Sequence, residues 1–162
     1  QLSLNMANFS LLEALSNIHK NYSSQNNKKD LKIVFDGCEN SLDVLYSDEV
    51  RLKQIVTNFI SNAFKFTSEG EIRIGAKYLP QDKFAIYVSD TGIGMDQEQQ
   101  DKIFNRFYQV EDPYTKQFSG AGLGLSISKN LAEALSGKIE LESQPNKGST
   151  FRLVLPNSII VK

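Results

Sequence analysis

Polar side chains recur along one predicted helix at intervals that place them on a single face. The segment 48–66 has helical apolar periodicity, and at about 100° per residue its polar members fall within a narrow arc. Asparagine is a poor helix former, because its amide competes for backbone hydrogen bonds. Its neutral oxygen suits Mg²⁺, and a lysine one turn on would meet phosphate oxygens. An ordinary solvated face is the alternative for this stripe, which consists of Arg51, Gln54, Asn58, Asn62 and Lys65.

Two glycine-rich segments stand where a ligand can approach the backbone closely. Asp90-Thr-Gly-Ile-Gly94 follows a predicted strand, and a carboxylate at the strand end can accept a hydrogen bond from an exocyclic amine. Gly120-Ala-Gly-Leu-Gly124 opens a predicted helix, where clustered N–H groups make a phosphate cradle. Its spacing matches neither the dinucleotide fingerprint nor a P-loop. A capped turn and a flexible hinge are the respective alternatives.

The elements that must position these groups are helices in series with hairpins. Helices are expected from Leu11 to about Tyr22 and over 48–66, 96–104 and 123–136. Strands are expected at 31–35 and 42–46, paired around the Asp36-Gly37 turn, and as hairpins at 71–79 with 84–90 and 139–143 with 149–155. This order predicts an α+β fold: a two-layer α/β sandwich whose mixed, mostly antiparallel sheet carries helices on one face.

Composition excludes several classes of protein. The chain has 162 residues, enough for one domain over 1–162, and its 18 basic and 19 acidic residues leave a charge of −1 without a basic cluster, so no nucleic acid is expected. The single cysteine, Cys38, favours a reducing, cytoplasmic compartment. No segment approaches the roughly 20 apolar residues of a membrane span, so no direct membrane insertion is expected. We interpret the chain as a soluble piece of a longer protein, with a membrane-anchored receptor left open as its source.

Taken in order, five segments resemble the sequence boxes of the catalytic ATP-binding (HATPase) domain of sensor histidine kinases. That domain belongs to a superfamily shared with DNA gyrase, heat-shock chaperones and mismatch-repair ATPases, and it implies a Bergerat-type ATP-binding fold over about residues 9–156. The asparagine box, the first glycine box, the phenylalanine box, the second glycine box and the closing Gly-x-Thr segment are matched by Asn58–Thr67, Asp90–Gly94, Phe104–Phe107, Gly120–Leu125 and Gly148–Phe151.

The resemblance implies a role for each group on the predicted helix and the first glycine loop. Asn62 would coordinate Mg²⁺ with Asn58 assisting one turn earlier, and Lys65 would contact phosphate. Asp90 would accept the adenine amino proton and so select adenine. In the same nucleotide-binding loop, Gly94 would leave room for the base, next to Gly92.

The resemblance also implies nucleotide contacts later in the chain. Tyr108 would flank the nucleotide, and Thr150 would support adenine through water. Lys116 would reach the γ-phosphate, with a solvated lysine as the alternative. The phosphates would be wrapped by Gly120, Gly122 and Gly124, with Leu123 and Leu125 positioning a lid.

One position distinguishes the expected reaction from ATP hydrolysis. Hydrolysing relatives carry a Glu one turn before the metal asparagine, where it activates water as a general base. Here that position is Asn58, which cannot take a proton, so we expect poor hydrolysis and transfer of the γ-phosphoryl group elsewhere. The acceptor implied by the resemblance is a histidine on a separate dimerisation domain of the same full-length protein, with a response-regulator receiver domain downstream. The only histidine here, His19, lacks a neighbouring acid and is interpreted as structural.

The same five sequence segments are compatible with other functions. A nucleotide-gated interaction module would bind ATP and recognise a partner without transfer. A protein-serine kinase of the anti-sigma-factor type is disfavoured by the Phe-x-x-Phe box and by Lys65-Phe-Thr67. The run Phe107-Tyr-Gln-Val-Glu111 is more similar to hybrid kinases, which carry a receiver domain of their own.

Overall fold

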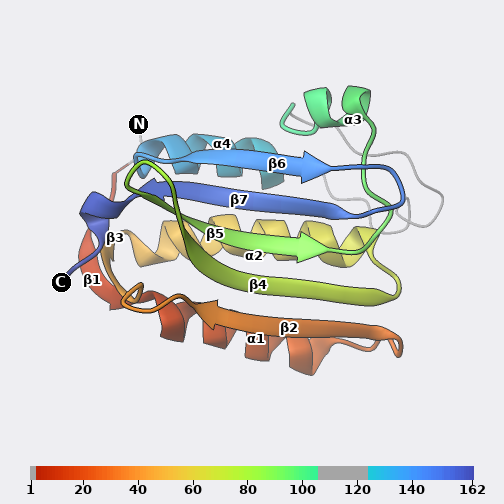
Figure 1. The fold of residues 1–162 in the computed structure, drawn as a ribbon, viewed down its shortest axis with the longest axis horizontal. Helices are drawn as coiled ribbons and strands as arrows, with labels where there is room; N and C mark the ends of the chain where they lie inside the picture. Colours follow the sequence, from red (N-terminus) through yellow and green to blue (C-terminus); the bar gives the residue numbers. More distant parts are fainter. Residues whose placement is uncertain (1–2, 106–123) are drawn as a thin grey trace.

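The computed structural model describes residues 3–105 and 124–162, which form a sheet with helices packed on one face (Figure 1). The predicted α+β class is therefore confirmed. In chain order the elements are β1 (Ala7–Ser10), α1 (Leu11–Gln25), β2 (Leu31–Cys38), β3 (Val44–Ser47), α2 (Glu49–Phe66), β4 (Gly70–Leu79), β5 (Lys83–Asp90), α3 (Gln97–Lys102), α4 (Gly124–Ala134), β6 (Lys138–Ser143), β7 (Ser149–Pro156) and a 3₁₀ turn, η2 (Asn157–Ile159).

The main sheet has five strands in the order β2-β4-β5-β7-β6. Only β2 and β4 run parallel, so the sheet is mixed and mostly antiparallel, as predicted. A parallel pair needs a long crossover, and here the connection contains α2, which lies against the sheet. The crossover therefore fixes the helix that carries the polar stripe beneath the centre of the sheet.

The predicted pairing of the strands at 31–35 and 42–46 is wrong. β3 pairs instead with β1, a strand that the sequence did not predict, in a separate two-stranded sheet with Ala7 opposite Ser47. Gly37 has a φ of +77°, but it forms a register shift inside β2 rather than a hairpin turn. Because the chain passes through this bulge and continues to Cys38, β2 pairs with β4 along its whole length.

Helix α2 is anchored at both ends and along its apolar face. The carboxylate of Asp48 caps its start by accepting the N–H of Arg51 at 3.1 Å. Near its end the ammonium of Lys28 donates to the carbonyls of Phe64 and Thr67, which places a cation at the negative end of the helix dipole. The buried Phe59 ring stacks on Phe151 of β7 with centroids 5.3 Å apart. These contacts fix the rotation of α2 and hence the direction of its polar stripe.

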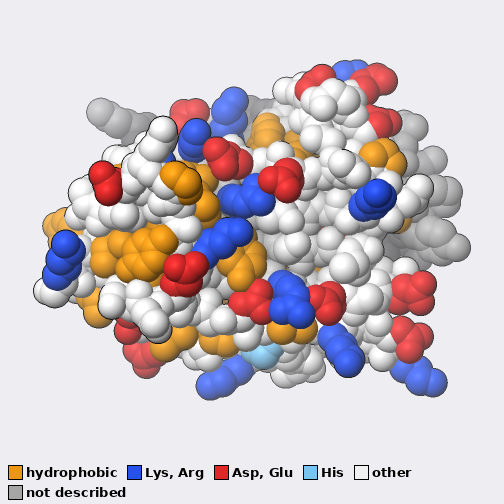
Figure 2. All heavy atoms as spheres, viewed as in Figure 1, with side chains coloured by type: hydrophobic (Ala, Val, Ile, Leu, Met, Phe, Trp, Pro, Cys, Tyr) orange, Lys and Arg blue, Asp and Glu red, His pale blue; other side chains and the backbone are white. Residues whose placement is uncertain are grey.

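The face of the sheet that carries no helices bears both charged and hydrophobic side chains. Figure 2 views this face and shows basic and acidic side chains intermixed over its middle, with a hydrophobic patch on the left. Arg73 contacts Asp36 at 2.7 Å, and Arg152 contacts Glu142 at 3.0 Å. Such exposed pairs contribute about 0–1 kcal/mol each. Across residues 3–105 and 124–162, no helix has both the length and the apolar character needed to cross a membrane.

Candidate functional site

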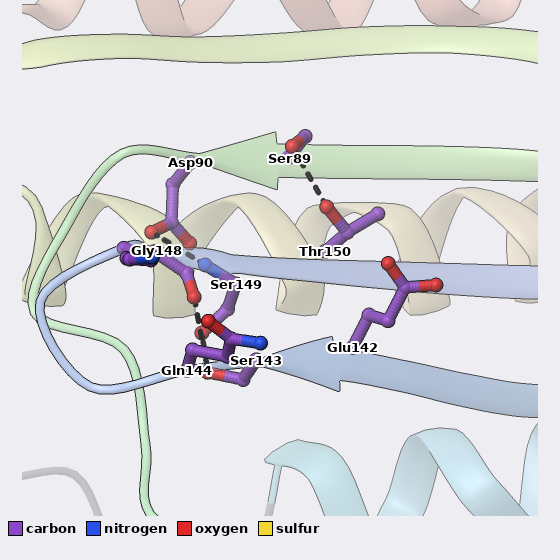
Figure 3. Close-up of a pocket in the computed structure, with 9 residues that line it drawn as sticks. Ser89, Asp90, Glu142, Ser143, Gln144, Gly148, Ser149 and Thr150 are labelled. Atoms are coloured by element: carbon purple, nitrogen blue, oxygen red, sulfur yellow. Dashed lines mark hydrogen bonds between the residues drawn. The ribbon is translucent and has the colours of Figure 1, made fainter.

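Asp90 ends β5 with a buried carboxylate that is only partly used by the protein. Its side chain is 6% exposed and lies on the helix-covered face, as the strand alternation with buried Val88 requires. The carboxylate oxygen Oδ1 accepts the backbone N–H of Gly92 at 2.9 Å. It also accepts the backbone N–H of Ser149 at 3.3 Å (Figure 3). Because these bonds from the described residues go to Oδ1, Oδ2 is available to a donor on a ligand.

Burial raises the pKa of the Asp90 carboxyl above its ordinary value, and the N–H groups of Gly92 and Ser149 offset this only in part. The side chain of Thr67 lies close enough to favour the charged carboxylate but does not reach hydrogen-bond geometry. Its buried hydroxyl has no hydrogen-bond partner in the part of the chain that the structure describes. Two buried polar groups at the end of α2 therefore retain capacity for hydrogen bonds to a ligand or its water.

The glycines after Asp90 are required by contacts between chain segments. A Cβ atom on Gly92 would lie 2.1 Å from the carbonyl oxygen of Phe66, at the end of α2. Gly94 has a φ of +66°, and a Cβ there would lie 1.9 Å from the carbonyl oxygen of Gln144, in the β6–β7 turn. The N–H of Ile93 also bonds to the Phe66 carbonyl at 3.1 Å. The loop is thus clamped between α2 and the turn, which fixes Asp90 relative to the helix.

We expect Gly94→Ala to lower the free energy of unfolding by on the order of 3 kcal/mol, because it adds a backbone collision to the strain of a positive φ. Gly37→Ala is the matched control, since Gly37 has a φ of +77° but a Cβ atom there would have nothing within 4 Å. It should cost only about 1 kcal/mol. Urea unfolding measures both, and equal losses would show that the close approach to Gln144 is unimportant.

The β5–β7 register separates the two hydroxyl residues that follow Gly148. Thr150 lies opposite Ser89 on the helix-free face, where the two hydroxyls are 2.8 Å apart (Figure 3). Ser149 lies opposite Asp90, is 7% exposed, and places its hydroxyl 2.7 Å from that of Ser143. The residue beside Asp90 is therefore Ser149, which the sequence interpretation missed. Alternation with buried Phe151 in the same strand is the signal that identifies it.

The polar stripe of α2 connects this carboxylate to the start of α4. The amide nitrogen of Asn58 donates to the Gly124 carbonyl at 3.0 Å and to the Ser128 hydroxyl at 2.9 Å. At about 1.5 Å per residue, Asn58 lies roughly 12 Å along the helix axis from Phe66, where the Asp90 loop packs. Asn62 and Lys65 lie between these ends, half-buried, and neither forms a hydrogen bond with another described residue.

The structure describes only some of the predicted site residues in the second half of the chain. Gly124 begins α4, and Leu125 packs into the core with 8% exposure. Phe104, the first residue of the phenylalanine box, is partly buried and packs against the core, with its ring edge-on to that of Phe151 at 6.3 Å between centroids. The predicted residues that lie outside the described part of the chain are Tyr108, Lys116, Gly120, Gly122 and Leu123.

A cavity of about 240 Å³ opens at the ends of β5 and β7 (Figure 3). Its lining includes Asp90, Ser149 and Thr150, together with Lys147 of the β6–β7 turn. Ligand pockets usually have volumes of roughly 300–1,000 Å³. This cavity is therefore too small to enclose a large ligand alone, and its described lining residues come from β5, β6, β7 and the β6–β7 turn.

The donor set near α2 suits a metal that keeps most of its water. Within residues 3–105 and 124–162 there is no cluster of three or more His, Cys, Asp or Glu side chains that would cage a metal. Mg²⁺ typically takes one or two protein oxygens plus waters and phosphate oxygens. The amide of Asn62 fits this demand, because it makes no hydrogen bond to the described residues and is half-buried.

Comparison with known proteins agrees with this arrangement. The family model described as "Histidine kinase-, DNA gyrase B-, and HSP90-like ATPase" matches residues 47–159. The autoinducer 2 sensor kinase/phosphatase LuxQ of Vibrio vulnificus (strain CMCP6) is 47% identical over 120 residues, which is 69% of this chain and 14% of LuxQ. The chain thus spans about one seventh of the length of this relative.

Solved structures extend the similarity to nearly the whole chain. Full-length ShkA in complex with AMPPNP matches with a TM-score of 0.83 and 28% identity over 96% of this chain and 32% of ShkA. The nucleotide-free catalytic domain of the histidine kinase ThkA matches with a TM-score of 0.79 and 26% identity over 95% of this chain and 97% of that domain. ThkA in complex with the response regulator TrrA matches with a TM-score of 0.74 and 25% identity, covering 94% and 42% of the two chains.

Proposed function

Because this chain belongs to the family of histidine kinase-, DNA gyrase B- and HSP90-like ATPases, we propose that it binds Mg²⁺-ATP and donates the γ-phosphoryl group to a histidine of a separate domain. The match to the ThkA catalytic domain over 97% of its length supports the kinase branch of the family. The proposed process is two-component signalling.

The observation that carries this proposal is the half-used carboxylate of Asp90. The carboxylate is buried, and the two backbone N–H groups that bond to it both donate to Oδ1, which leaves Oδ2 without a bond from them. The adenine amino group is a donor of the right kind, whereas guanine presents a carbonyl oxygen at the same ring position. A site built around a buried acceptor rejects the ligand that lacks the donor, because the acceptor would remain unpaired. Asp90 would therefore select adenine, with Ser149 rather than Thr150 beside the base.

The other end of α2 has the chemistry expected near phosphates. The first turn of α4 begins at Gly124, and the N-terminus of a helix presents free N–H groups to anions. Lys65 would pair with phosphate oxygens, and Asn62 would hold Mg²⁺. When bound, this ion neutralises charge on the triphosphate. The separation of roughly 12 Å along α2 leaves room for the sugar between base and phosphates.

The reaction would transfer phosphoryl from ATP to imidazole rather than to water. A nitrogen of the acceptor histidine would form the P–N bond while the bond from the γ-phosphorus to the β–γ bridging oxygen breaks, and ADP would leave. The imidazole proton would pass to a base beside the acceptor histidine on its own domain. Asn58 is not a base, and both of its amide hydrogens are donated to α4. Slow hydrolysis by the isolated chain is the expected consequence.

The acceptor histidine is assigned to a dimerisation domain of the same full-length protein. His19 does not serve, because its Nε2 lies 2.8 Å from the Ile33 carbonyl oxygen and its ring stacks on Phe35. The ThkA complex with a response regulator supports a receiver domain as the next acceptor, and similarity to LuxQ supports a sensor kinase as the longer protein. We place the domain in the cytoplasm, where ATP is available.

The proposal is tested by adding the domain that would carry the acceptor histidine. The chain is incubated with γ-labelled ATP, Mg²⁺ and the dimerisation domain of a related sensor kinase. Acid-labile label on that domain's histidine, absent when the histidine is replaced, supports the proposal. Nucleotide-dependent binding without label would instead indicate an interaction module, acid-stable label would indicate a serine kinase, and rapid phosphate release by the chain alone would indicate an ATPase.

Adenosine binding should weaken on acidification earlier than an ordinary aspartate would predict. The pKa of Asp90 is raised by burial, so the charged acceptor is lost as pH falls through a value above the usual aspartate range. Adenosine is used because it has no phosphates that titrate. Affinity is measured by calorimetry between pH 4.5 and 8, with Asp90→Asn as the variant that should show no such dependence. A flat profile for the native chain would remove Asp90 from the base-binding role.

A further inference from the structure

Helices α2 and α4 are joined by a closed set of hydrogen bonds. The amide nitrogen of Asn58 has two hydrogens, and it donates to the carbonyl of Gly124 at 3.0 Å and to the hydroxyl of Ser128 at 2.9 Å. The hydroxyl of Ser128 in turn donates to the same Gly124 carbonyl at 2.8 Å. Each of the three groups is thus bonded to the other two, and Ser128 is fully buried.

The bond pattern determines which atoms of Asn58 remain usable. Both amide hydrogens point at α4, so only the carbonyl oxygen Oδ1 can serve a ligand. A Cβ atom added to Gly124 would stand 3.6–3.8 Å from the Asn58 amide atoms, so the side chain lies against the helix start in ordinary contact. An aspartate at position 58 would reproduce the shape but would place an acceptor against the Gly124 carbonyl. These contacts therefore require Asn58 to donate through its amide nitrogen, and they leave its Oδ1 open to a ligand.

The location of this cluster links two parts of the proposed nucleotide site. Asn58 lies one helical turn before Asn62, and Gly124 is both the first residue of α4 and the last glycine of the second glycine box. Fixing the first turn of α4 fixes the direction of its N–H groups. A preorganised set of N–H groups binds an anion without having to order first.

We propose that Asn58 and Ser128 are positioning residues, which hold the first turn of α4 against α2 so that its N-terminus is set to receive the nucleotide phosphates. This inference rests on the proposed function, and it gives Asn58 a second role beside that of an assisting ligand of Mg²⁺: it is the donor that aligns the phosphate end of the site. Ser128, which the sequence interpretation did not include, acts through Asn58 and Gly124 and does not touch the nucleotide.

The test is a double-mutant cycle with two ligands. We expect Asn58→Ala and Ser128→Ala each to raise the Kd for Mg²⁺-ATP about tenfold, whereas the Kd for adenosine stays within about twofold. The double variant should be about as impaired as either single variant, because both substitutions remove the same link. Ser47→Ala removes a buried hydroxyl from β3, outside the site, and should leave both affinities unchanged. Additive losses, or equal losses for adenosine and ATP, would overturn the proposal.

Two further measurements separate this inference from others. Asn58→Asp keeps a metal-binding oxygen but removes the donors, so we expect weaker Mg²⁺-ATP binding; equal or tighter binding would show that donation to α4 is dispensable and would overturn the proposal. In the ligand-free chain, Ser128→Ala should speed amide hydrogen exchange in the first turns of α4, and unchanged exchange would contradict the link itself. If the native chain fails to bind ATP while this exchange effect is present, the proposed function fails and the α2–α4 link stands.

Discussion

Replacing Asp90 by Asn should weaken ATP binding by on the order of 100-fold and bring the affinities for ATP and GTP close together. The substitution changes Oδ2 from an acceptor into an amide donor, which would face the donating amino group of adenine. A hydrogen bond to a charged group contributes about 1.5–3 kcal/mol, and leaving the buried donor unpaired adds to the loss. The carbonyl oxygen of guanine would meet the new amide favourably, so GTP should lose little or gain.

The same substitution should not destabilise the fold, which distinguishes a binding role from a structural one. The remaining oxygen of Asn can still accept the N–H groups of Gly92 and Ser149, which bond only to Oδ1 in the native chain. The pKa of Asp90 is raised, so its folded state binds protons more readily than its unfolded state, and stability falls as pH rises through that range. A neutral amide avoids this cost at pH 7.

Calorimetric titration with ATP and GTP, together with a urea unfolding curve, therefore shows whether Asp90 has a binding role or a structural one. Reduced ATP affinity, relaxed selectivity and an unchanged or higher unfolding midpoint are expected. Thr150→Val is a control on the other face of the sheet, since the Thr150 hydroxyl contacts Ser89 rather than Asp90. If Asp90→Asn unfolds the chain or leaves the preference for ATP unaltered, the carboxylate serves the fold and not the base.

The parts of the fold that could be predicted from sequence are those that depend on neighbouring residues. α2 begins at Asp48 as its cap and its apolar period indicate, and β4–β5 and β6–β7 are hairpins joined by short connections. The pairing of β2 depends instead on β4, more than thirty residues later, and no local pattern specifies it. Gly37 suggested a hairpin turn, but a glycine with a positive φ occurs in β-bulges as well as in turns, and here it forms a bulge.

The candidate site shows the same division between local and distant information. Asp90 was identified because it ends a strand and precedes two glycines, and both properties are local. The requirement for Gly94 comes from the approach of Gln144, and the commitment of Asn58 comes from Ser128, seventy residues away. The choice between Ser149 and Thr150 was accessible, since β7 alternates buried and partly exposed residues through Phe151. The sequence analysis took Thr150 from the resemblance and did not use this alternation, which places Ser149 beside Asp90.

Asn62→Ala should abolish the Mg²⁺-dependent part of ATP binding while stabilising the helix that carries it. Alanine is the better helix former by roughly 0.5 kcal/mol, and Asn62 makes no hydrogen bond to another described residue whose loss would offset that gain. Asn62 keeps its whole amide available to a metal, whereas Asn58, whose two amide hydrogens are donated to α4, offers only its carbonyl oxygen. Adenosine binding, which needs no metal, should be unaffected.

The measurement compares ATP affinity with excess Mg²⁺ and with EDTA in the native chain and in three variants. The native chain should bind ATP far more tightly with Mg²⁺, Asn62→Ala should show no difference between the two conditions, and Asn62→Asp should retain most of the metal dependence, because a carboxylate is also a hard oxygen ligand. Ser61→Ala, on the neighbouring exposed position of α2, is the control for helix propensity and should behave as the native chain does. A persistent Mg²⁺ effect in Asn62→Ala would mean that the metal is held by other groups, of which the free carbonyl oxygen of Asn58 is the first candidate.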